Sequence, residues 1–201
     1  MSGMPECGMA TKPTLAVLSG PPGSGKTTLA HALARRIGCP ATIRDEIKQG
    51  MVISGRGEPA DGFDDLNLLT LDTFFAVLTT LICAGVTLVA EAAFQDKLWR
   101  PNVLPLNEIA DIRIIHCTAP TALIHDRITD RVDTDNHRHA HDDTALVAAI
   151  AASTESPIES FNPISLDAPA LTVDTSNGYR PGLDAIAQFV TQPNRRTPTH
   201  G

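Results

Sequence analysis

Aromatic residues are scarce in this chain: only 4% of its 201 residues are Phe, Trp or Tyr. A core for a single domain must therefore be built mainly from Leu, Ile, Val and Ala. An excess of basic residues is also lacking, since 16 Lys and Arg against 23 Asp and Glu give a net charge of −7. Duplex binding depends on neutralising phosphates, so this balance argues against nucleic acid as an obligate partner, although a local basic groove would be compatible with it.

Cysteine is sparse as well. The four cysteines (Cys7, Cys39, Cys83 and Cys117) lie far apart and show neither a C-x-x-C motif nor the spacing of a metal site. We expect them to be reduced, with Cys83 and Cys117 acting as small buried hydrophobic residues. No apolar run is expected to be long enough to span a bilayer, and no signal peptide is recognisable. These features predict a cytoplasmic protein with no membrane partner.

Between polar tails at 1–12 and 192–201, which we expect to be disordered, residues 13–191 alternate strand and helix patterns. Strands are predicted at 14–19, 41–44, 86–90, 112–117 and 170–174. Helices are predicted after residue 28 up to Gly38, from 45, and at about 65–84, 98–106, 121–131, 144–153 and 181–190. On helix 65–84 the expected buried face comprises Leu66, Leu69, Phe74, Leu78 and Leu81. The alternation predicts an α/β domain with a doubly wound, parallel, five-stranded sheet that binds its ligand at the carboxyl ends of the strands.

The most specific motif runs from Gly20 to Thr28 and fits G-x-x-x-x-G-K-[ST], the phosphate-binding P-loop. Its glycines let successive backbone N–H groups point at phosphate oxygens. Lys26 would contact the β- and γ-phosphates, and the Thr27 hydroxyl would bind Mg²⁺. We therefore expect a nucleotide to be held by Gly20, Pro21, Pro22, Gly23, Ser24, Gly25, Lys26, Thr27 and Thr28.

The neighbouring residues support this interpretation over a chance Gly-rich turn. The run 14–19 is apolar, as a buried parallel strand requires. After the loop, Leu29, Leu33 and Ile37 recur at helical spacing, and Gly38 and Pro40 follow as helix-ending residues. The positive end of that helix would face the phosphates.

Together with the P-loop, three further segments resemble small P-loop kinases: Arg44–Lys48, Glu91–Phe94 and Val173–Tyr179. This group includes zeta-toxin-like, chloramphenicol-phosphotransferase-like and gluconate-kinase-like enzymes, and kinases often labelled AAA-type ATP-binding proteins. The similarity covers about residues 13–191. It implies a nucleoside-monophosphate-kinase-like fold with a helical lid at about 127–143, ATP and Mg²⁺ as cofactors, and a small-molecule hydroxyl as acceptor.

In the resembled kinases, an aspartate at the position of Asp45 is the general base that orients the acceptor hydroxyl and takes its proton. Asp45 would equally suit the N-cap of the next helix. Arg44 could bind an anionic part of the substrate or be a solvated charge. Arg56, in the loop at 55–62, is a further candidate for contact with the acceptor.

Glu91 is the one charged residue at the end of an otherwise apolar strand. It could hold a water on Mg²⁺, as Walker B acids do, or accept a substrate hydroxyl. An ion pair with Arg100 or Arg44 is the structural alternative. Phe94 could form an apolar wall for the acceptor or belong to the core, as could Trp99.

Arg127 and Arg131 lie four residues apart and so share one helix face, and Arg138 follows in a polar segment. In the resembled kinases, lid arginines clamp the transferring phosphoryl group, so Arg127 and Arg131 are catalytic candidates and Arg131 and Arg138 nucleotide contacts. Ion pairs with neighbouring aspartates are the alternative. The alternating histidines at 137, 139 and 141 lack helical i,i+4 spacing and suggest at most a weak metal site.

The segment 174–179, after the last strand, is expected near the adenine, with Thr175 reading the base edge and Tyr179 stacking on it. A Gly-containing turn before the final helix explains the same residues without a ligand.

These observations favour an ATP-dependent small-molecule kinase with Asp45 as base. A zeta-toxin-like nucleotide-sugar kinase and a polynucleotide 5′-hydroxyl kinase are the enzymatic alternatives, and a non-catalytic nucleotide-binding regulator is the alternative of another class. A signalling GTPase is poorly supported, because neither N-K-x-D nor a D-x-x-G switch follows the loop. The sequence determines neither the acceptor nor the oligomeric state.

Overall fold

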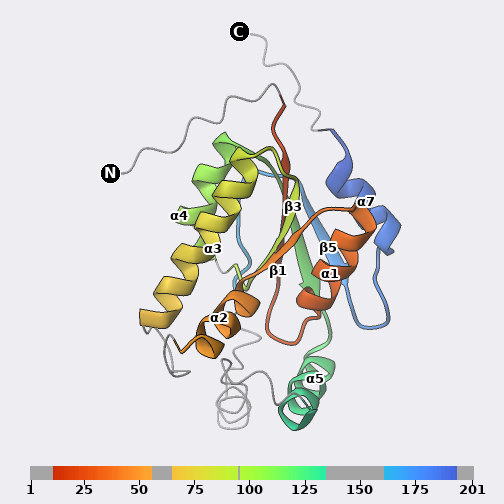
Figure 1. The fold of residues 1–201 in the computed structure, drawn as a ribbon. Coiled ribbons are helices and arrows are strands. Elements are labelled where there is room, and N and C mark those ends of the chain that lie inside the picture. The colour runs from red at the N-terminus through yellow and green to blue at the C-terminus, as the bar shows by residue number, and fades with distance from the viewer. Residues whose placement is uncertain (1–10, 56–64, 95, 135–160, 194–201) are drawn as a thin grey trace.

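The computed structural model of the chain describes residues 11–55, 65–94, 96–134 and 161–193. They form a parallel five-stranded sheet in the order β2-β3-β1-β4-β5 (Figure 1). The strands are β1 (Thr14–Ser19), β2 (Ala41–Ile43), β3 (Leu88–Glu91), β4 (Asp111–Thr118) and β5 (Ala170–Asp174). The order reverses at β1, which confirms the predicted doubly wound sheet.

Helices cover both faces of this sheet, because residues of each strand alternate between the faces. Leu15 and Val17 lie in one core cluster, which is covered by α3 (Asp65–Cys83), α4 (Asp96–Val103) and the 3₁₀ helix η1 (Leu104–Glu108). Ala16 and Leu18 lie in the other, beneath α1 (Lys26–Ile37) and α7 (Leu183–Thr191). Figure 1 shows these two groups of helices on opposite sides of the strands.

Few aromatic residues are available, and one group of them is gathered on one face of the sheet. Phe74, Phe94 and Trp99 contact one another, with ring centroids 6.0 Å apart for Phe74–Phe94 and 4.8 Å apart for Phe94–Trp99. Phe74 and Phe94 are fully buried and Trp99 is 6% exposed. Each of these three rings contributes a large buried area to this side of the core.

The buried face of α3 differs from the predicted one. Its fully or nearly buried residues are Leu66, Thr70, Phe74, Leu78 and Ile82, a regular i,i+4 series. Leu69, which was expected on this face, is 40% exposed. Apolar residues occupy most positions of this helix, so periodicity alone did not distinguish the buried stripe from its neighbours. Thr70 is tolerated in the core since its hydroxyl donates to the Leu66 carbonyl oxygen at 2.6 Å.

The expectation that no segment is long and apolar enough to span a bilayer is wrong for α3. This helix has 19 residues and a mean hydropathy of 1.8 over its most apolar window, of which 28% is buried. It is the one such helix among the described residues. Its buried stripe packs on the sheet, as the stripe of a core helix in a soluble domain does, so the property is weak support for a membrane span.

The cysteines follow the prediction in part. Cys117 is a buried free thiol, and burial raises its pKa to about 12. Cys39 is free and half-buried, and burial raises its pKa as well. Cys83 was expected to be a reduced, buried residue, but it is half-buried and disulfide-bonded.

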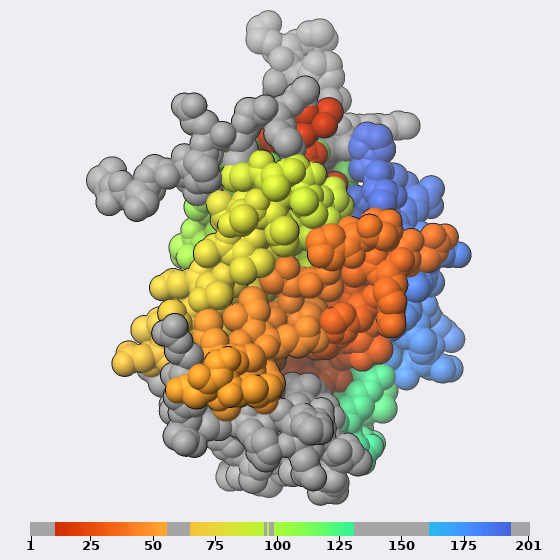
Figure 2. Space-filling view, viewed as in Figure 1, coloured from red at the N-terminus to blue at the C-terminus, as the bar shows by residue number. Residues whose placement is uncertain are grey.

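Two helices lie at the end of the molecule where the strands terminate, α2 (Arg44–Ile53) and α5 (Thr121–Thr134) (Figure 1). α2 begins directly after β2, so Arg44, expected in the strand, is its first residue. In Figure 2 the orange surface of α2 lies against the yellow surface of α3. The Thr70 hydroxyl contacts the sulfur of Met51 across this contact at 3.5 Å. The helix predicted at 144–153 lies outside the described residues.

We predict that Phe74→Ala lowers the free energy of unfolding by about 3–5 kcal/mol, because it leaves a cavity among fully buried rings. Leu69→Ala, on the exposed side of the same helix, should change it by less than about 1 kcal/mol. Urea denaturation of both variants measures the difference. Equal losses would show that the buried stripe of α3 is misassigned.

Candidate functional site

The loop between β1 and α1 depends on glycine at three positions. Gly20, Gly23 and Gly25 have φ of 152°, 75° and 78°. A Cβ at Gly20 would lie 2.5 Å from the Cys117 carbonyl oxygen, and one at Gly23 would lie 2.9 Å from Cγ2 of Ile124. Side chains are excluded at both places by backbone conformation and by space. The loop therefore lies tightly against the ends of β4 and α5.

The interior of the loop has the chemistry of a phosphate site. The Ser24 hydroxyl oxygen is buried and has no hydrogen-bond partner among the described residues. Lys26 Nζ donates to the Pro21 carbonyl oxygen at 2.9 Å and so lies folded over the loop. α1 begins at Lys26, which directs the positive end of the helix at the loop. An orphaned donor, an ammonium group and a helix N-terminus together fit a bound phosphate.

Thr27 of α1 and Glu91 of β3 are joined by a hydrogen bond, in which Thr27 Oγ1 donates to Glu91 Oε2 at 3.0 Å. The sheet register explains the meeting, because Glu91 is level with Leu18 of β1, two residues before the loop begins. Both groups offer the oxygen ligands that Mg²⁺ prefers. Among the described residues, no group of three or more His, Cys, Asp or Glu is arranged to hold a metal, so any Mg²⁺ would rely on this pair and on phosphate oxygens.

Glu91 is 3% exposed. Burial is the main cause that raises the pKa of its carboxyl group. The positive charge of Lys26 and the Thr27 hydrogen bond lower this pKa, whereas the negative charges of Asp45 and Glu46 raise it further. Glu91 is thus a buried carboxyl group near one lysine and two acidic groups, an environment that favours a cation.

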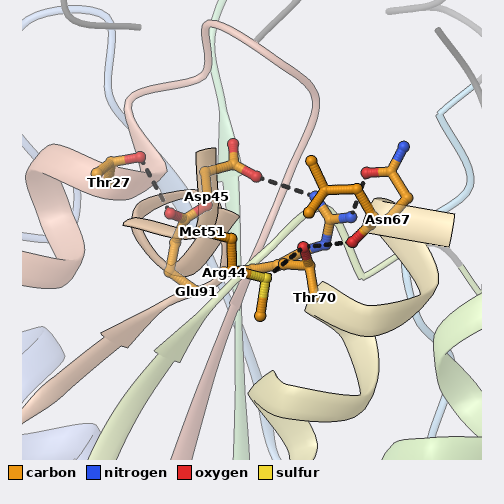
Figure 3. Close-up of polar contacts among 8 residues, drawn as sticks. Thr27, Arg44, Asp45, Met51, Asn67, Thr70 and Glu91 are labelled. Atoms are coloured by element: carbon orange, nitrogen blue, oxygen red, sulfur yellow. Dashed lines mark hydrogen bonds and ion pairs between the residues drawn. The ribbon is translucent and has the colours of Figure 1, made fainter. Parts of the chain in front are cut away.

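Asp45 lies in the first turn of α2, between the Thr27–Glu91 pair and the Arg44–Asn67 pair (Figure 3). Its side chain is 44% exposed, and Oδ1 accepts from Arg44 Nη1 at 3.2 Å. Arg44 Nη2 donates to Asn67 Oδ1 of α3 at 2.8 Å. Asp45 is therefore held at the edge of the nucleotide site while it remains open to solvent.

Two alternatives considered from the sequence do not hold for these carboxylates. The N-cap of α2 is Ile43 and makes no side-chain cap, so Asp45 is inside the helix and does not cap it. Glu91 hydrogen bonds with Thr27, and the ion pair of Arg44 is made to Asp45. Both acidic groups are consequently left on the nucleotide side of the sheet.

Arg127 and Thr175 form a clamp beneath the P-loop. Arg127 donates from Nη2 to the Thr175 carbonyl oxygen at 2.7 Å and from Nη1 to the Gly23 carbonyl oxygen at 3.3 Å. The Thr175 hydroxyl donates to the Ser24 carbonyl oxygen at 2.8 Å. Arg127 was expected either on the phosphates or in surface ion pairs, and Thr175 on the adenine. Their contacts show that Arg127 and Thr175 hold the P-loop in position. Direct contact with a nucleotide stays a prediction for both residues.

Other predicted residues lie elsewhere. The Phe94 ring is fully buried in the aromatic cluster, so it belongs to the core and does not form the expected acceptor wall. Tyr179 packs against the cluster beneath α1 and α7. The Arg131 side chain, and Arg56, Arg138 and the histidines at 137, 139 and 141, lie outside the described part of the chain. Arg131 belongs to α5 by its backbone.

Sequence reasoning missed two residues. Lys48 of α2, to which the sequence assigned no role of its own, is only 7% exposed. His116, near the end of β4 beside Ser19, is half-buried; burial lowers its pKa, and its Nδ1 has no partner among the described residues. The i,i+4 spacing of Arg44 and Lys48 was the available signal for the first, and a lone polar residue at a strand end for the second.

The chain is similar to known proteins over most of its length. Residues 15–157, which are most of the chain, match a family described as an AAA domain. No curated protein is similar enough to count as a match. A proposed kinase from Chloroflexus aurantiacus J-10-fl is 25% identical, with a TM-score of 0.70, and the similarity covers 90% of this chain and 97% of that one.

Two other solved structures show the same fold. A sugar kinase from Janibacter sp. HTCC2649 is 19% identical, with a TM-score of 0.54 and coverage of 89% of this chain and 91% of that chain. The APS kinase of Mycobacterium tuberculosis, in complex with AMPPNP and APS, is 19% identical, with a TM-score of 0.56 and coverage of 88% and 94%. The fold is thus that of P-loop kinases.

We predict that Glu91→Gln stabilises the protein at neutral pH while it weakens Mg²⁺-dependent nucleotide binding by about 10–100-fold. A raised pKa means that folding favours the protonated form of the Glu91 carboxyl group. The contribution of this group to stability is therefore present below about pH 4.5, the pKa of the unfolded chain, and is lost as the pH rises through the pKa of the folded protein.

The gain in melting temperature of Glu91→Gln over wild type should therefore grow with pH and vanish in acid. Glu108→Gln, on the exposed side of η1, serves as the control and should show neither effect. A pH-independent difference for Glu91→Gln would contradict the burial argument.

We also predict that Thr175→Val lowers stability by about 1–3 kcal/mol, because it leaves the Ser24 carbonyl without its donor. Nucleotide affinity should fall as well, by about 10-fold for each 1.4 kcal/mol that ordering the loop adds to the free energy of binding. Thr172→Val, on the exposed side of β5, is the matched control. Denaturant titration and binding of a fluorescent ATP analogue measure the two effects; unchanged affinity would show that the clamp does not position the loop.

Proposed function

The chain belongs to the AAA domain family, and from the geometry of its site we propose that it is an ATP-dependent kinase that transfers the γ-phosphate to a hydroxyl of a small molecule. One observation carries the proposal. A solvent-accessible carboxylate, Asp45, lies next to the Thr27–Glu91 pair at the carboxyl edge of the sheet (Figure 3). An acceptor hydroxyl needs such a group beside the γ-phosphate.

On the donor side, the loop from Gly20 to Thr28 would enclose the phosphates of ATP, with the Ser24 hydroxyl and Lys26 as donors. Thr27 and Glu91 would hold Mg²⁺, and their oxygen atoms fit its ligand preference. When bound, the ion neutralises charge on the β- and γ-phosphates. Glu91 is dry and already hydrogen-bonded to Thr27, so little rearrangement is needed to hold the cation.

On the acceptor side, Asp45 would accept the proton of the acceptor hydroxyl while the hydroxyl oxygen forms a bond to the γ-phosphorus. The bond between the γ-phosphorus and the bridging oxygen of the β-phosphate breaks at the same time, and ADP is released. The ion pair with Arg44, itself fixed by Asn67, limits the rotation of the carboxylate. An oriented base of this kind contributes typically about 10²–10⁴-fold to the rate. Arg131 and Arg138 stay candidates for contact with the phosphates.

The known kinases with this fold act on different acceptors, as the names sugar kinase and APS kinase state. Their similarity supports phosphoryl transfer in general and selects neither acceptor. It also does not distinguish zeta-toxin-like, chloramphenicol-phosphotransferase-like and gluconate-kinase-like enzymes, or a polynucleotide 5′-hydroxyl kinase. A non-catalytic nucleotide-binding regulator is the alternative of another class, and it would have no use for a base at Asp45.

The test is to incubate the protein with Mg²⁺-ATP and pooled alcohols, sugars, nucleosides and antibiotics, and to follow phosphorylated products by mass. With the acceptor found, we predict that Asp45→Asn lowers kcat by about 10²–10⁴-fold and leaves the KM for ATP nearly unchanged. Asp72→Asn, on the exposed face of α3, is the matched control and should retain full activity.

Full turnover by Asp45→Asn would overturn the assignment of the base. Tight ATP binding with no product from any pool would favour the regulator. Lys26→Ala is the loss-of-function control for the donor site, because loss of its ammonium group should abolish phosphoryl transfer.

A further inference from the structure

Phe94 has a backbone conformation that the proposed chemistry does not explain. Its φ is 41°, and it is the one non-glycine residue with a positive φ in the described part of the chain. This left-handed conformation is strained for a bulky side chain. Such strain persists only where the surrounding structure holds it, and strained residues are concentrated at functional sites. Phe94 lies three residues after Glu91, the last residue of β3.

Packing fixes the side chain of Phe94 but not the peptide that precedes it. The ring is fully buried and contacts the rings of Phe74 and Trp99. With the ring and Cα held in this way, φ depends on the orientation of the peptide plane between Ala93 and Phe94, because φ is the rotation about the N–Cα bond of Phe94. A contact that holds this peptide plane therefore also holds the strain.

Ser19 makes such a contact. It is the last residue of β1, directly before the P-loop, and it is fully buried. Its hydroxyl donates to the Ala93 carbonyl oxygen at 2.9 Å, and the Phe94 carbonyl oxygen lies 3.4 Å away. The cost of a strained φ and the net gain from one hydrogen bond are of the same order. Loss of the Ser19 hydroxyl would therefore allow the turn to relax.

Relaxation of this turn would be transmitted to Glu91. On the far side of the turn, Asp96 is held by two hydrogen bonds to the segment 162–165, at 3.1 and 2.9 Å. On the near side, the backbone hydrogen bond that follows Glu91, from the Ala92 N–H to β1, is long at 3.3 Å. The less firmly held end carries Glu91, so its 3.0 Å contact with Thr27 would be disturbed (Figure 3).

We propose that Ser19 is a positioning residue for the cation-binding pair: it holds the strained turn at Phe94 and so keeps Glu91 against Thr27. This inference rests on the proposed function, in which Thr27 and Glu91 hold Mg²⁺ together with ATP. The alternative is that Ser19 only satisfies buried carbonyl groups of the turn. Its loss would then lower stability and leave Mg²⁺-dependent nucleotide binding intact.

The test compares AMPPNP binding by the full chain in Mg²⁺ and in EDTA, measured by calorimetry. Ser19→Ala should reduce the gain in affinity that Mg²⁺ produces by about 10-fold or more, as expected when the support of a metal ligand is lost. Its affinity for AMPPNP in EDTA should match that of wild type, because the P-loop and Lys26 are retained. Ser19→Cys keeps nearly the same volume with a much weaker donor and should show the same loss.

The conformation of the turn can be followed without any ligand. Trp99 is the only tryptophan of the chain, and its ring centroid lies 4.8 Å from that of Phe94, so its fluorescence reports on the turn. The emission maximum should shift in Ser19→Ala and Ser19→Cys. Thr191→Val is the control: it removes a hydroxyl that donates to the Ala187 carbonyl oxygen at 2.9 Å in α7, on the other face of the sheet, and it should change neither property.

The proposal requires both effects together. An unchanged Mg²⁺ effect in Ser19→Ala and Ser19→Cys overturns it. A reduced Mg²⁺ effect with unchanged Trp99 emission also overturns it, because the turn would not then connect Ser19 to Glu91. Equal losses of AMPPNP affinity in Mg²⁺ and in EDTA would show general damage to the P-loop and would overturn it as well.

The acceptor screen distinguishes this inference from the function on which it rests. If a product forms but Ser19→Ala retains the Mg²⁺ effect of wild type, the kinase stands and the positioning role is wrong. If no product forms but Ser19→Ala loses the Mg²⁺ effect, the positioning role stands and the kinase proposal fails. If wild type binds AMPPNP equally well in Mg²⁺ and in EDTA, the inference is wrong whatever the screen finds.

Discussion

The hydrogen bond from Thr27 to the buried carboxylate of Glu91 is the contact around which the remaining site is arranged. It joins the first turn of α1 to the end of β3, the strand next to β1, and so helps to fix the P-loop relative to the sheet. A carboxylate that is 3% exposed needs compensation, and Lys26 and the Thr27 hydroxyl provide it only in part. Because the charge of Glu91 is only partly compensated, the site favours binding of a cation together with a nucleotide.

The P-loop is supported from below by residues of three other segments. The Cys117 carbonyl fills the space where a side chain at Gly20 would lie, Ile124 does the same at Gly23, and Thr175 holds the Ser24 carbonyl. Arg127 connects two of these segments. A loop with three glycines is entropically unfavourable to order, and these contacts are what keep its N–H groups oriented before any ligand arrives.

Acceptor chemistry is concentrated on α2, which follows β2 without an intervening loop. This abrupt start places Arg44 and Asp45 at fixed positions relative to the sheet edge, because the helix axis is set by its packing on α3 through Asn67, Thr70 and Met51. A base on a helix is held more rigidly than one on a loop, which suits proton transfer over a short distance.

The sequence by itself determined the P-loop, the parallel five-stranded sheet and the position of Glu91 at a strand end, because glycine spacing and apolar runs are local signals. It did not determine which stripe of α3 is buried, that Phe94 is a core residue, or that Arg127 and Thr175 clamp the loop. It also left open whether Asp45 was a cap or an exposed carboxylate. Those outcomes depend on which residues from distant segments meet, and only the tertiary structure decides how much water each side chain retains and which partner it finds.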